Sequence, residues 1–272
     1  MHCDYHFLFL KDIMKTVLIG SGNVMTHLGR RIVECGHEVI QIYSRNIDHA
    51  RQLCESLSCG ATATDYIRDI VNEADAYIIS VSDSVLPEVA AQLCPHRKGL
   101  FVHTSGSIPL SIFDGYAERY GILYPLQTFS RQRPIEHFEE IPFFIEGSDE
   151  KTLDDISRIA RSLTSAQVIP MDSERRKYLH LAAVFACNFA NHCYALAGEI
   201  LSKADIDFHV MNALIEETAR KAKDADPKDV QTGPAARKDY NVMERHLDML
   251  KENPRLRVLY RLLSESIMTK VK

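Results

Sequence analysis

A glycine-rich turn near the start of the chain restricts the fold more than any other feature of the sequence. A short apolar run ends at Ile19, Gly20 and Gly22 follow closely, and a helical pattern then begins. Gly20 can take a backbone conformation closed to other residues, and Gly22 leaves room for a phosphate beside the free N–H groups of a helix start. The pattern therefore predicts a parallel strand, a tight turn and a helix that bind a dinucleotide.

The residues around this turn favour the nucleotide interpretation over a plain tight turn. A helix over residues 24–35 and a strand over residues 39–43 complete a βαβ unit of the expected length. Met25 replaces the third glycine of the usual G-x-G-x-x-G fingerprint, which predicts a slightly wider spacing between helix and strand. The predicted cofactor residues of the turn are Gly20, Ser21, Gly22, Asn23 and Val24.

The end of the second predicted strand indicates which dinucleotide binds. An NAD site places a carboxylate there to hold the ribose hydroxyls, whereas this chain has Ser44, Arg45 and Asn46. A carboxylate would repel a 2′-phosphate, but a hydroxyl and a guanidinium can bind it. NADP is therefore predicted in preference to NAD, with Ser44 and Arg45 as its contacts. The alternative for Arg45 is a solvated surface arginine.

The composition is that of an ordinary globular protein. The 272 residues are 46% hydrophobic and 25% charged, which suffices for two domains with a core each. A net charge of -5 and a pI of about 6.2 argue against a nucleic-acid or anionic-membrane partner, although a basic patch could be local. Seven cysteines without a C-x-x-C pair predict free thiols in a reducing cytoplasm and no metal site.

The stretch before Met14 is predicted to have no functional role. Its apolar patch, residues 7–10, is too short for a signal-peptide core or a membrane span. Because Met14 and Lys15 directly precede the first strand, we interpret the preceding residues as an upstream start or a loosely held extension. The expected location is the cytoplasm.

Three later strands are each followed by a polar loop. The strands are apolar runs at residues 76–81, 99–103 and 121–124. The loops after them are residues 82–84, 104–107 and 125–130. Ligands in open parallel sheets bind outside the carboxyl ends of the strands, so these loops are predicted to form the site. Val81 and Ser82, as a second wall of the cleft, are predicted cofactor contacts.

The character of the sequence changes at Ser173, where strand signals vanish. A helix of residues 174–202 carries small and apolar side chains at helical spacing, and it needs neighbours on several sides. Three further helices, at residues 208–223, 240–252 and 254–270, can supply some of these neighbours, and a second subunit the rest. We therefore expect homodimerisation through this helical part.

The predicted fold is α/β, with a Rossmann-type parallel-sheet domain at residues 14–172 and an all-helical C-terminal domain at residues 173–272. The remaining elements expected in the first domain are helices at residues 48–58, 67–72 and 150–163 and strands at residues 142–147 and 166–170, with a short connection or small strand at residues 61–64. No low-complexity linker separates the two domains, so their boundary is expected to be tightly packed.

Five motifs carry a resemblance to a known family. They are Gly20–Val24, His103–Ser107, Tyr124–Ser130, His180–Asn188 and Thr232–Asp239. In this combination the chain resembles a bacterial family of predicted NADP-dependent oxidoreductases, in which a Rossmann-like domain precedes an uncharacterised helical domain. The wider superfamily includes pyrroline-5-carboxylate reductase, ketopantoate reductase, the β-hydroxyacid dehydrogenases and the F420-dependent NADP oxidoreductases. The resemblance implies a fold and a cofactor but little about the reaction.

One departure separates the chain from the β-hydroxyacid dehydrogenases. These enzymes carry a catalytic lysine four residues before an asparagine of the long helix, and here Val184 stands four residues before Asn188. Lys177 lies two turns earlier and could not occupy the same place. The resemblance therefore does not imply a simple hydroxyacid dehydrogenase.

Hydride transfer to a carbonyl or imine needs a proton donor near the acceptor atom. His180 is the candidate, because histidine donates protons near neutral pH and the long helix faces the nicotinamide in the related enzymes. A core or surface histidine is the alternative. Asn188 lies eight residues later, about 12 Å along an ideal helix, so it would line another part of the groove or tie helices together.

Two loops supply the remaining candidates. Ser105, with His103 and Ser107 beside it, could hold a substrate carboxylate or the nicotinamide carboxamide, or could stabilise its own turn. Arg237 could bind an anionic substrate with Asp239 orienting its guanidinium, or this pair could be a structural clip.

The functional prediction is a cytoplasmic NADPH-dependent reductase of a small, carboxylate-bearing carbonyl or imine substrate. Its predicted catalytic residues are His180, Ser105, Asn188 and Arg237. The alternative is a sensor or scaffold protein that binds NADP without turnover, which the missing lysine favours and the polar loops disfavour. A third possibility is F420 as the hydride partner.

Overall fold

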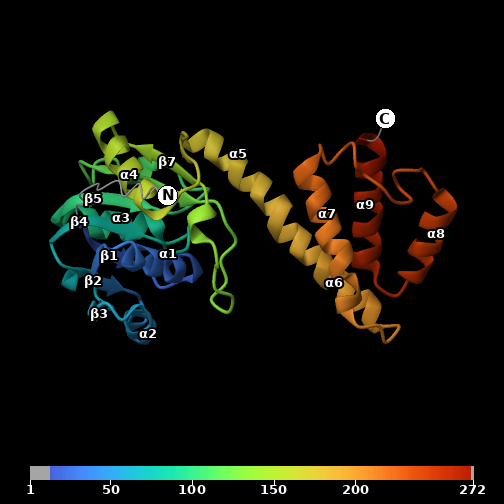
Figure 1. Ribbon diagram of the computed structural model, residues 1–272, viewed down its shortest axis with the longest axis horizontal. Helices are drawn as coiled ribbons and strands as arrows, with labels where there is room; N and C mark the ends of the chain where they lie inside the picture. The colour runs from blue at the N-terminus through green and yellow to red at the C-terminus, as the bar shows by residue number, and fades with distance from the viewer. Residues whose placement is uncertain (1–12, 271–272) are drawn as a thin grey trace, which may run out of the picture. The chain divides into compact units, whose positions relative to one another are not determined.

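The structure is a computed structural model that describes residues 13–270 (Figure 1). The chain divides into two compact units, of which the first ends at Ala190 and the second begins at Asn191. The first unit holds the sheet and the second is helical. The first helix of the predicted helical part, α5 (Ser173–Ala183), lies in the first unit.

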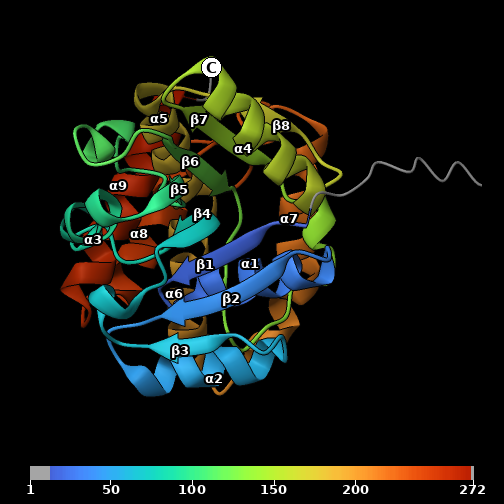
Figure 2. The same ribbon diagram turned by 90° about the vertical axis from the view of Figure 1, so that its left-hand side faces the viewer.

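The first unit is built on an eight-stranded sheet with the order β3-β2-β1-β4-β5-β6-β7-β8, which Figure 2 shows from β3 at the bottom to β8 at the top. Its strands are β1 (Lys15–Ile19), β2 (Glu38–Tyr43), β3 (Thr62–Thr64), β4 (Glu73–Ile79), β5 (Lys98–His103), β6 (Tyr120–Pro125), β7 (Phe143–Gly147) and β8 (Val168–Pro170). Its helices besides α5 are α1 (Asn23–Glu34), α2 (Ile47–Leu57), α3 (Leu86–Leu93) and α4 (Glu150–Leu163). The predicted α/β class with a Rossmann-type sheet is confirmed.

One strand pair departs from the predicted parallel sheet. β6 and β7 are antiparallel, whereas the other neighbouring pairs are parallel. A parallel neighbour requires a crossover, usually through a helix. The segment between Pro125 and Phe143 contains only a 3-10 turn, Phe138–Glu140, so the chain reverses at the edge of β6.

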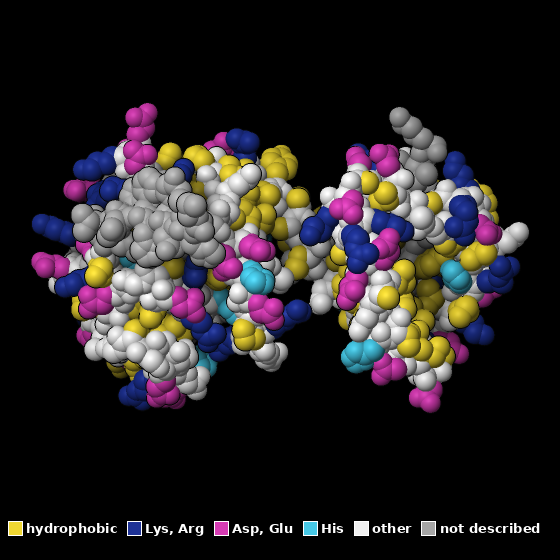
Figure 3. All heavy atoms as spheres, viewed as in Figure 1, with side chains coloured by type: hydrophobic (Ala, Val, Ile, Leu, Met, Phe, Trp, Pro, Cys, Tyr) yellow, Lys and Arg dark blue, Asp and Glu magenta, His cyan; other side chains and the backbone are white. Residues whose placement is uncertain are grey.

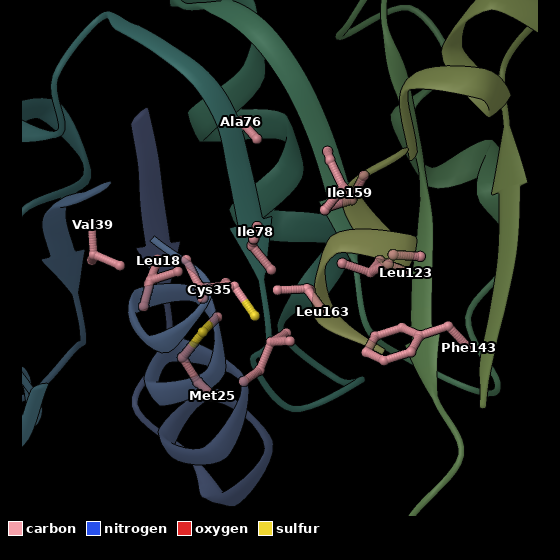
Figure 4. Packing of buried hydrophobic residues seen from close by; sticks show 14 of the residues in the cluster. Leu18, Met25, Cys35, Val39, Ala76, Ile78, Leu123, Phe143, Ile159 and Leu163 are labelled. Atoms are coloured by element: carbon pink, nitrogen blue, oxygen red, sulfur yellow. The ribbon is translucent and has the colours of Figure 1, made fainter. Parts of the chain in front are cut away.

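Side chains on the two faces of the sheet enter two hydrophobic cores. Leu18 of β1 and Ile78 of β4 lie in the core beneath α1, α2 and α4, where Met25 and Leu163 pack with them (Figure 4). Their neighbours in the strands, such as Val17, enter the other core, which α3 covers. Each fully buried aliphatic side chain contributes about 1.5–3 kcal/mol. Burial on both faces explains why these strands read as continuous apolar runs.

The helix predicted at residues 67–72 is wrong. Only the 3-10 turn Ile67–Asp69 forms there, and β4 already begins at Glu73. Side chains from distant parts of the sequence form hydrogen bonds with backbone groups that would pair with each other in a helix. The Arg97 guanidinium donates to the carbonyl oxygen of Ile70, and the Gln41 side-chain oxygen accepts from the N–H of Val71 at 2.8 Å. These contacts hold the segment extended.

The predicted long helix is continuous but changes its winding. A π-helical segment (Val184–Phe189) joins α5 to α6 (Ala190–Ser202). The second unit continues with a 3-10 turn (Phe208–Met211), α7 (Asn212–Asp224), α8 (Tyr240–Met249) and α9 (Pro254–Lys270). No helix within residues 13–270 combines the length and the apolar character needed to span a bilayer.

Candidate active site

Gly20 occupies the turn between β1 and α1 in the conformation predicted for it. Its φ is +108°, and a Cβ at this position would lie 2.2 Å from the carbonyl oxygen of Ser80. Its N–H donates to the carbonyl oxygen of Tyr43 at 2.8 Å. Neither the dihedral angle nor the space admits another residue, so the turn is fixed by the backbone.

No contact within the described protein explains why residue 22 is a glycine. It caps α1 with ordinary extended dihedral angles, and nothing lies within 4 Å of a Cβ built on it. The helix has no side-chain cap and no acidic residue in its first turn. Its N–H groups therefore face an open surface with the positive end of the helix dipole, which suits an anion.

The close contact between helix and strand is made by a glycine that the fingerprint does not contain. A Cβ at Gly29 would lie 2.9 Å from Leu18 Cδ1 of β1 and 3.3 Å from Leu57 Cδ1 of α2. Met25, at the expected glycine position one turn earlier, is fully buried in the core. Gly29 therefore has the packing role of the third glycine of the fingerprint. The wider spacing predicted from Met25 did not take Gly29 into account.

Ser44 lies against the glycine turn. The Ser21 hydroxyl donates to Ser44 Oγ at 2.9 Å, and both residues are buried. Arg45 beside them is exposed and makes no hydrogen bond or ion pair with any described residue. Asn46 caps α2 by accepting from the N–H of Asp48 at 2.9 Å. A hydroxyl and a guanidinium without a partner among the described residues thus stand at the end of β2.

The loop after β4 approaches the same turn. Val81 Cγ1 would lie 3.3 Å from a Cβ at Gly20, so this side chain packs on the glycine turn. Ser82 is exposed, and its carbonyl oxygen accepts the N–H groups of Val85 and Leu86, which starts α3. Asp83 links this loop to the next one, because its carboxylate accepts a hydrogen bond from the Ser107 hydroxyl.

The Ser105 hydroxyl organises its own loop after β5. Its oxygen accepts the N–H groups of Ser107 at 3.2 Å and Ile108 at 3.1 Å. This is the stabilised turn that the sequence left open as an alternative. The Ser105 hydroxyl also lies 3.5 Å from Ser107 Oγ, whose own proton is donated to Asp83. A substrate contact by Ser105 stays a prediction.

His103 is a buried structural residue and does not face the open loop. It is 0% exposed, and its Nδ1 accepts the N–H of Ser105 at 3.1 Å. Burial lowers the pKa of His103 to about 3, and the positive charge of Arg176 adds to the effect. The ring is therefore neutral near pH 7 and cannot serve as a proton donor there.

His180 of α5 lies directly on the loop after β5. Its Nδ1 is 3.1 Å from the Tyr124 hydroxyl at the end of β6, and the two rings meet edge to face at 6.0 Å. A Cβ on Gly106 would lie 2.5 Å from His180 Nδ1, so the absence of a side chain there admits the imidazole. Sequence reasoning assigned no role to Tyr124 or Gly106, although Gly106 belongs to a loop predicted to form the site and Tyr124 ends the strand before another such loop.

A buried ion pair fixes α5 one turn before His180. Arg176 is 0% exposed and donates to Glu146 Oε2 of β7 at 2.6 Å and to the Ile108 carbonyl oxygen at 2.6 Å. Ser173 Oγ donates to the same Glu146 oxygen at 2.7 Å. Sequence reasoning missed this cluster. It ties the helix to the sheet and to the loop after β5, and thereby positions His180.

Two predicted catalytic residues remain, Asn188 and Arg237. Asn188 is exposed in the π-helical segment, and Arg237 is exposed in the second unit. The Asp239 carboxylate caps α8 by accepting the N–H of Val242 at 3.1 Å, so its role in orienting the Arg237 guanidinium stays a prediction. Within residues 13–270, no three His, Cys, Asp or Glu side chains gather as metal ligands.

Comparisons with known proteins show the family to which the chain belongs. Residues 15–103 match the family model described as NADP oxidoreductase, coenzyme F420-dependent, and residues 141–267 match a domain of unknown function, DUF2520. The structure of a Bacteroides fragilis protein, BF3122, which is described as an NADP oxidoreductase, is similar to this one. The two sequences are 44% identical, the TM-score is 0.90, and the match covers 94% of this chain and 98% of that one. The chain belongs to this NADP oxidoreductase family.

More distant structures share the fold. Protein TM1727 from Thermotoga maritima is 26% identical with a TM-score of 0.68, over 94% of this chain and 98% of that one. A pyrroline-5-carboxylate reductase from Coxiella burnetii is 16% identical with a TM-score of 0.57, over 96% and 98%. The search of curated proteins gave no match.

Family membership makes NAD(P)-dependent oxidoreduction the class of chemistry of this protein. The matched NADP oxidoreductase region runs from β1 to β5 and so contains the glycine turn and the end of β2. Those residues fit a dinucleotide, because the turn is open at Gly22 and the start of α1 has no cap of its own. The DUF2520 region contains Arg176 and His180.

Proposed function

We propose that this protein is an NADPH-dependent reductase of a small carbonyl or imine substrate, with His180 as the proton donor. The observation that carries the proposal is the position of His180. Its imidazole lies on the Ser105–Ser107 loop and against Tyr124, at the carboxyl ends of β5 and β6. This is the edge of the sheet at which the glycine turn follows β1, and ligands of such sheets bind there.

NADP is proposed over NAD because of the groups at the end of β2. Ser44 is held beside the glycine turn by Ser21, and the guanidinium of Arg45 has no partner among the described residues. A 2′-phosphate would give Arg45 a charge-assisted contact, whereas the ribose hydroxyls of NAD would find no carboxylate.

The residues of the chain account for positioning and proton delivery. When bound, the reduced nicotinamide supplies the hydride. The Tyr124 hydroxyl engages His180 Nδ1, which leaves Nε2 to give a proton to the acceptor oxygen or nitrogen. Burial raises the pKa of Tyr124, and the charge of Arg176 opposes that rise, so Tyr124 stays protonated and orients the imidazole.

The test is a screen of small carbonyl and imine acids with NADPH, followed by His180→Ala on the best substrate. We expect kcat to fall by about 100-fold or more, in the range of a lost general acid. His96→Ala is the matched control, because His96 is exposed and precedes β5, away from the carboxyl ends of the strands. An unchanged kcat in His180→Ala would remove the proposed role.

The same screen separates the alternatives. A protein that binds NADP as a sensor would show NADPH binding without turnover of any substrate. A reaction seen only when F420 is supplied would identify the deazaflavin as the hydride partner. Contact of a substrate carboxylate with Arg237 stays a prediction, and an unchanged KM in Arg237→Ala would remove it.

We further propose a homodimer formed through the helical part of the chain. Large apolar side chains of its helices are exposed, with Leu181 at 54%, Phe185 at 64% and Leu262 at 57%. Figure 3 shows hydrophobic side chains on the surface of the second unit. Burying such side chains stabilises an interface by about 1.5–3 kcal/mol each, which favours a second copy as the missing neighbour.

Light scattering after gel filtration tests the dimer. The wild-type protein should have twice the chain mass of 30.9 kDa, and Phe185→Asp should shift it toward the monomer. Glu199→Gln, an exposed change on α6, is the control. A monomeric wild-type protein would contradict the proposal.

A further inference from the structure

The segment between β6 and β7 folds back onto the glycine turn. Asn23 Nδ2 donates to the Phe129 carbonyl oxygen at 3.1 Å, and His27 Nε2 lies 2.9 Å from the Ser130 carbonyl oxygen. The guanidinium of Arg131 donates to the carbonyl oxygen of Ser21 within the turn itself. Three consecutive residues of this segment thus contact the turn and the first two turns of α1.

Packing keeps the segment in this place. The Phe129 ring lies 5.6 Å from the His27 ring and 6.4 Å from Phe138, which is buried in the core. The N–H of Arg133 donates to the Ser130 carbonyl oxygen at 3.2 Å, which closes a tight turn around Arg131. The position of Arg131 therefore follows from anchored neighbours on both sides.

The charge of Arg131 is not neutralised by any described residue. No carboxylate forms an ion pair with it within residues 13–270, and the first turn of α1 has no acidic residue. A guanidinium has five N–H donors, and the Ser21 carbonyl engages only one edge of it. The remaining donors are free for an oxyanion, in a geometry that suits phosphate.

We infer that Arg131 is a phosphate-binding residue of the dinucleotide site and contacts the pyrophosphate. The segment Gln127–Arg133 then forms an outer wall over the glycine turn. This inference rests on the proposed NADP site. The pyrophosphate is assigned because Arg131 meets the turn at Ser21, directly before Gly22, whereas the groups for the 2′-phosphate, Ser44 and Arg45, lie at the end of β2.

Calorimetric titration of Arg131→Gln with NADPH and with NADH tests the inference. The pyrophosphate is common to both dinucleotides, so we expect both dissociation constants to rise by about tenfold, as for the loss of a charged hydrogen bond. Arg133→Gln removes the same charge two residues away and should change both constants by less than about twofold. Arg131→Lys keeps the charge without the fork and should give an intermediate loss.

Each outcome decides the inference. Equal losses for NADPH and NADH support it, with unchanged thermal unfolding as evidence that the variant is folded. A loss confined to NADPH would overturn the pyrophosphate assignment, and unchanged binding would overturn the role of Arg131 altogether. If the wild-type protein binds NADPH and Arg131→Gln binds it equally well, this inference fails while the proposed function stands. If the wild-type protein binds neither dinucleotide, both fail.

Discussion

The glycine turn and the His180 cluster lie at the same edge of the sheet but are built from different parts of the chain. The turn is made by the backbone, and its residue choice is dictated by space around Gly20 and Gly29. The cluster is made by side chains from β6, β7 and α5 that contact one another across long sequence separations. A site formed by the backbone restricts the residue type at only a few positions. A site formed by side chains depends on every residue of its hydrogen-bond and ion-pair network.

The largest expected effect is on the side-chain site. Arg176→Met removes the fully buried partner of an ion pair and leaves Glu146, whose side chain is 18% exposed, without its cation. The free energy of unfolding should fall by about 3–5 kcal/mol. Chemical denaturation measures it. The double variant Arg176→Met/Glu146→Leu is the control and should recover part of the loss, because no unpaired charge stays buried. Equal stability of Arg176→Met and wild type would show that the pair does not hold α5.

The next effect is on the backbone site. Gly20→Ala places a Cβ 2.2 Å from the Ser80 carbonyl oxygen at a φ of +108°. We expect a loss of about 3 kcal/mol in the free energy of unfolding, together with loss of dinucleotide binding.

Gly22→Ala is the matched control for the backbone site. Its Cβ meets nothing within 4 Å, so stability should change by no more than about 0.5 kcal/mol. Binding of NADPH should nevertheless weaken, because the new methyl group lies where the phosphate approaches. Unchanged NADPH binding in Gly22→Ala would contradict the placement of the phosphate.

The smallest effect is a pH dependence of stability that comes from His103, the last residue of β5. Burial lowers the pKa of His103 from 6.5 to about 3, so the unfolded chain binds its proton first as the pH falls. The stabilisation by neutral His103 is fully present above pH 6.5 and is lost progressively between pH 6.5 and 3. By pH 5.5 the loss is about 1.4 kcal/mol.

Denaturation of wild type and His103→Leu between pH 8 and 5.5 measures this contribution. The charged groups that face His103 are Arg176 and Asp83, and both are common to the two proteins. The stability difference between them should change by about 1.4 kcal/mol over this range. Parallel pH curves would show that His103 titrates alike in the folded and unfolded chains.

The backbone site could be predicted from the sequence because its signals are local. The apolar run before Gly20, the helix after Gly22 and the polar residues at Ser44 and Arg45 lie within one βαβ unit. The packing glycine was the exception, since only the structure shows that the backbone approaches Leu18 closely at Gly29.

The side-chain site could be predicted only in part. His180 and the Ser105 loop were candidates from chemistry, but Tyr124 and the Arg176–Glu146 pair depend on contacts between residues 30 and 56 positions apart. The return of the segment after β6 onto the glycine turn depends on the antiparallel β7, whose direction an apolar run does not encode.

A calorimetric titration of wild type and Arg45→Ala with NADPH and NADH tests whether the glycine turn and the end of β2 bind NADP. We predict tighter binding of NADPH than of NADH by the wild type, and loss of about tenfold for NADPH alone in the variant. Equal binding of both dinucleotides that Arg45→Ala leaves unchanged would contradict the NADP assignment, and absence of any binding would contradict the reductase.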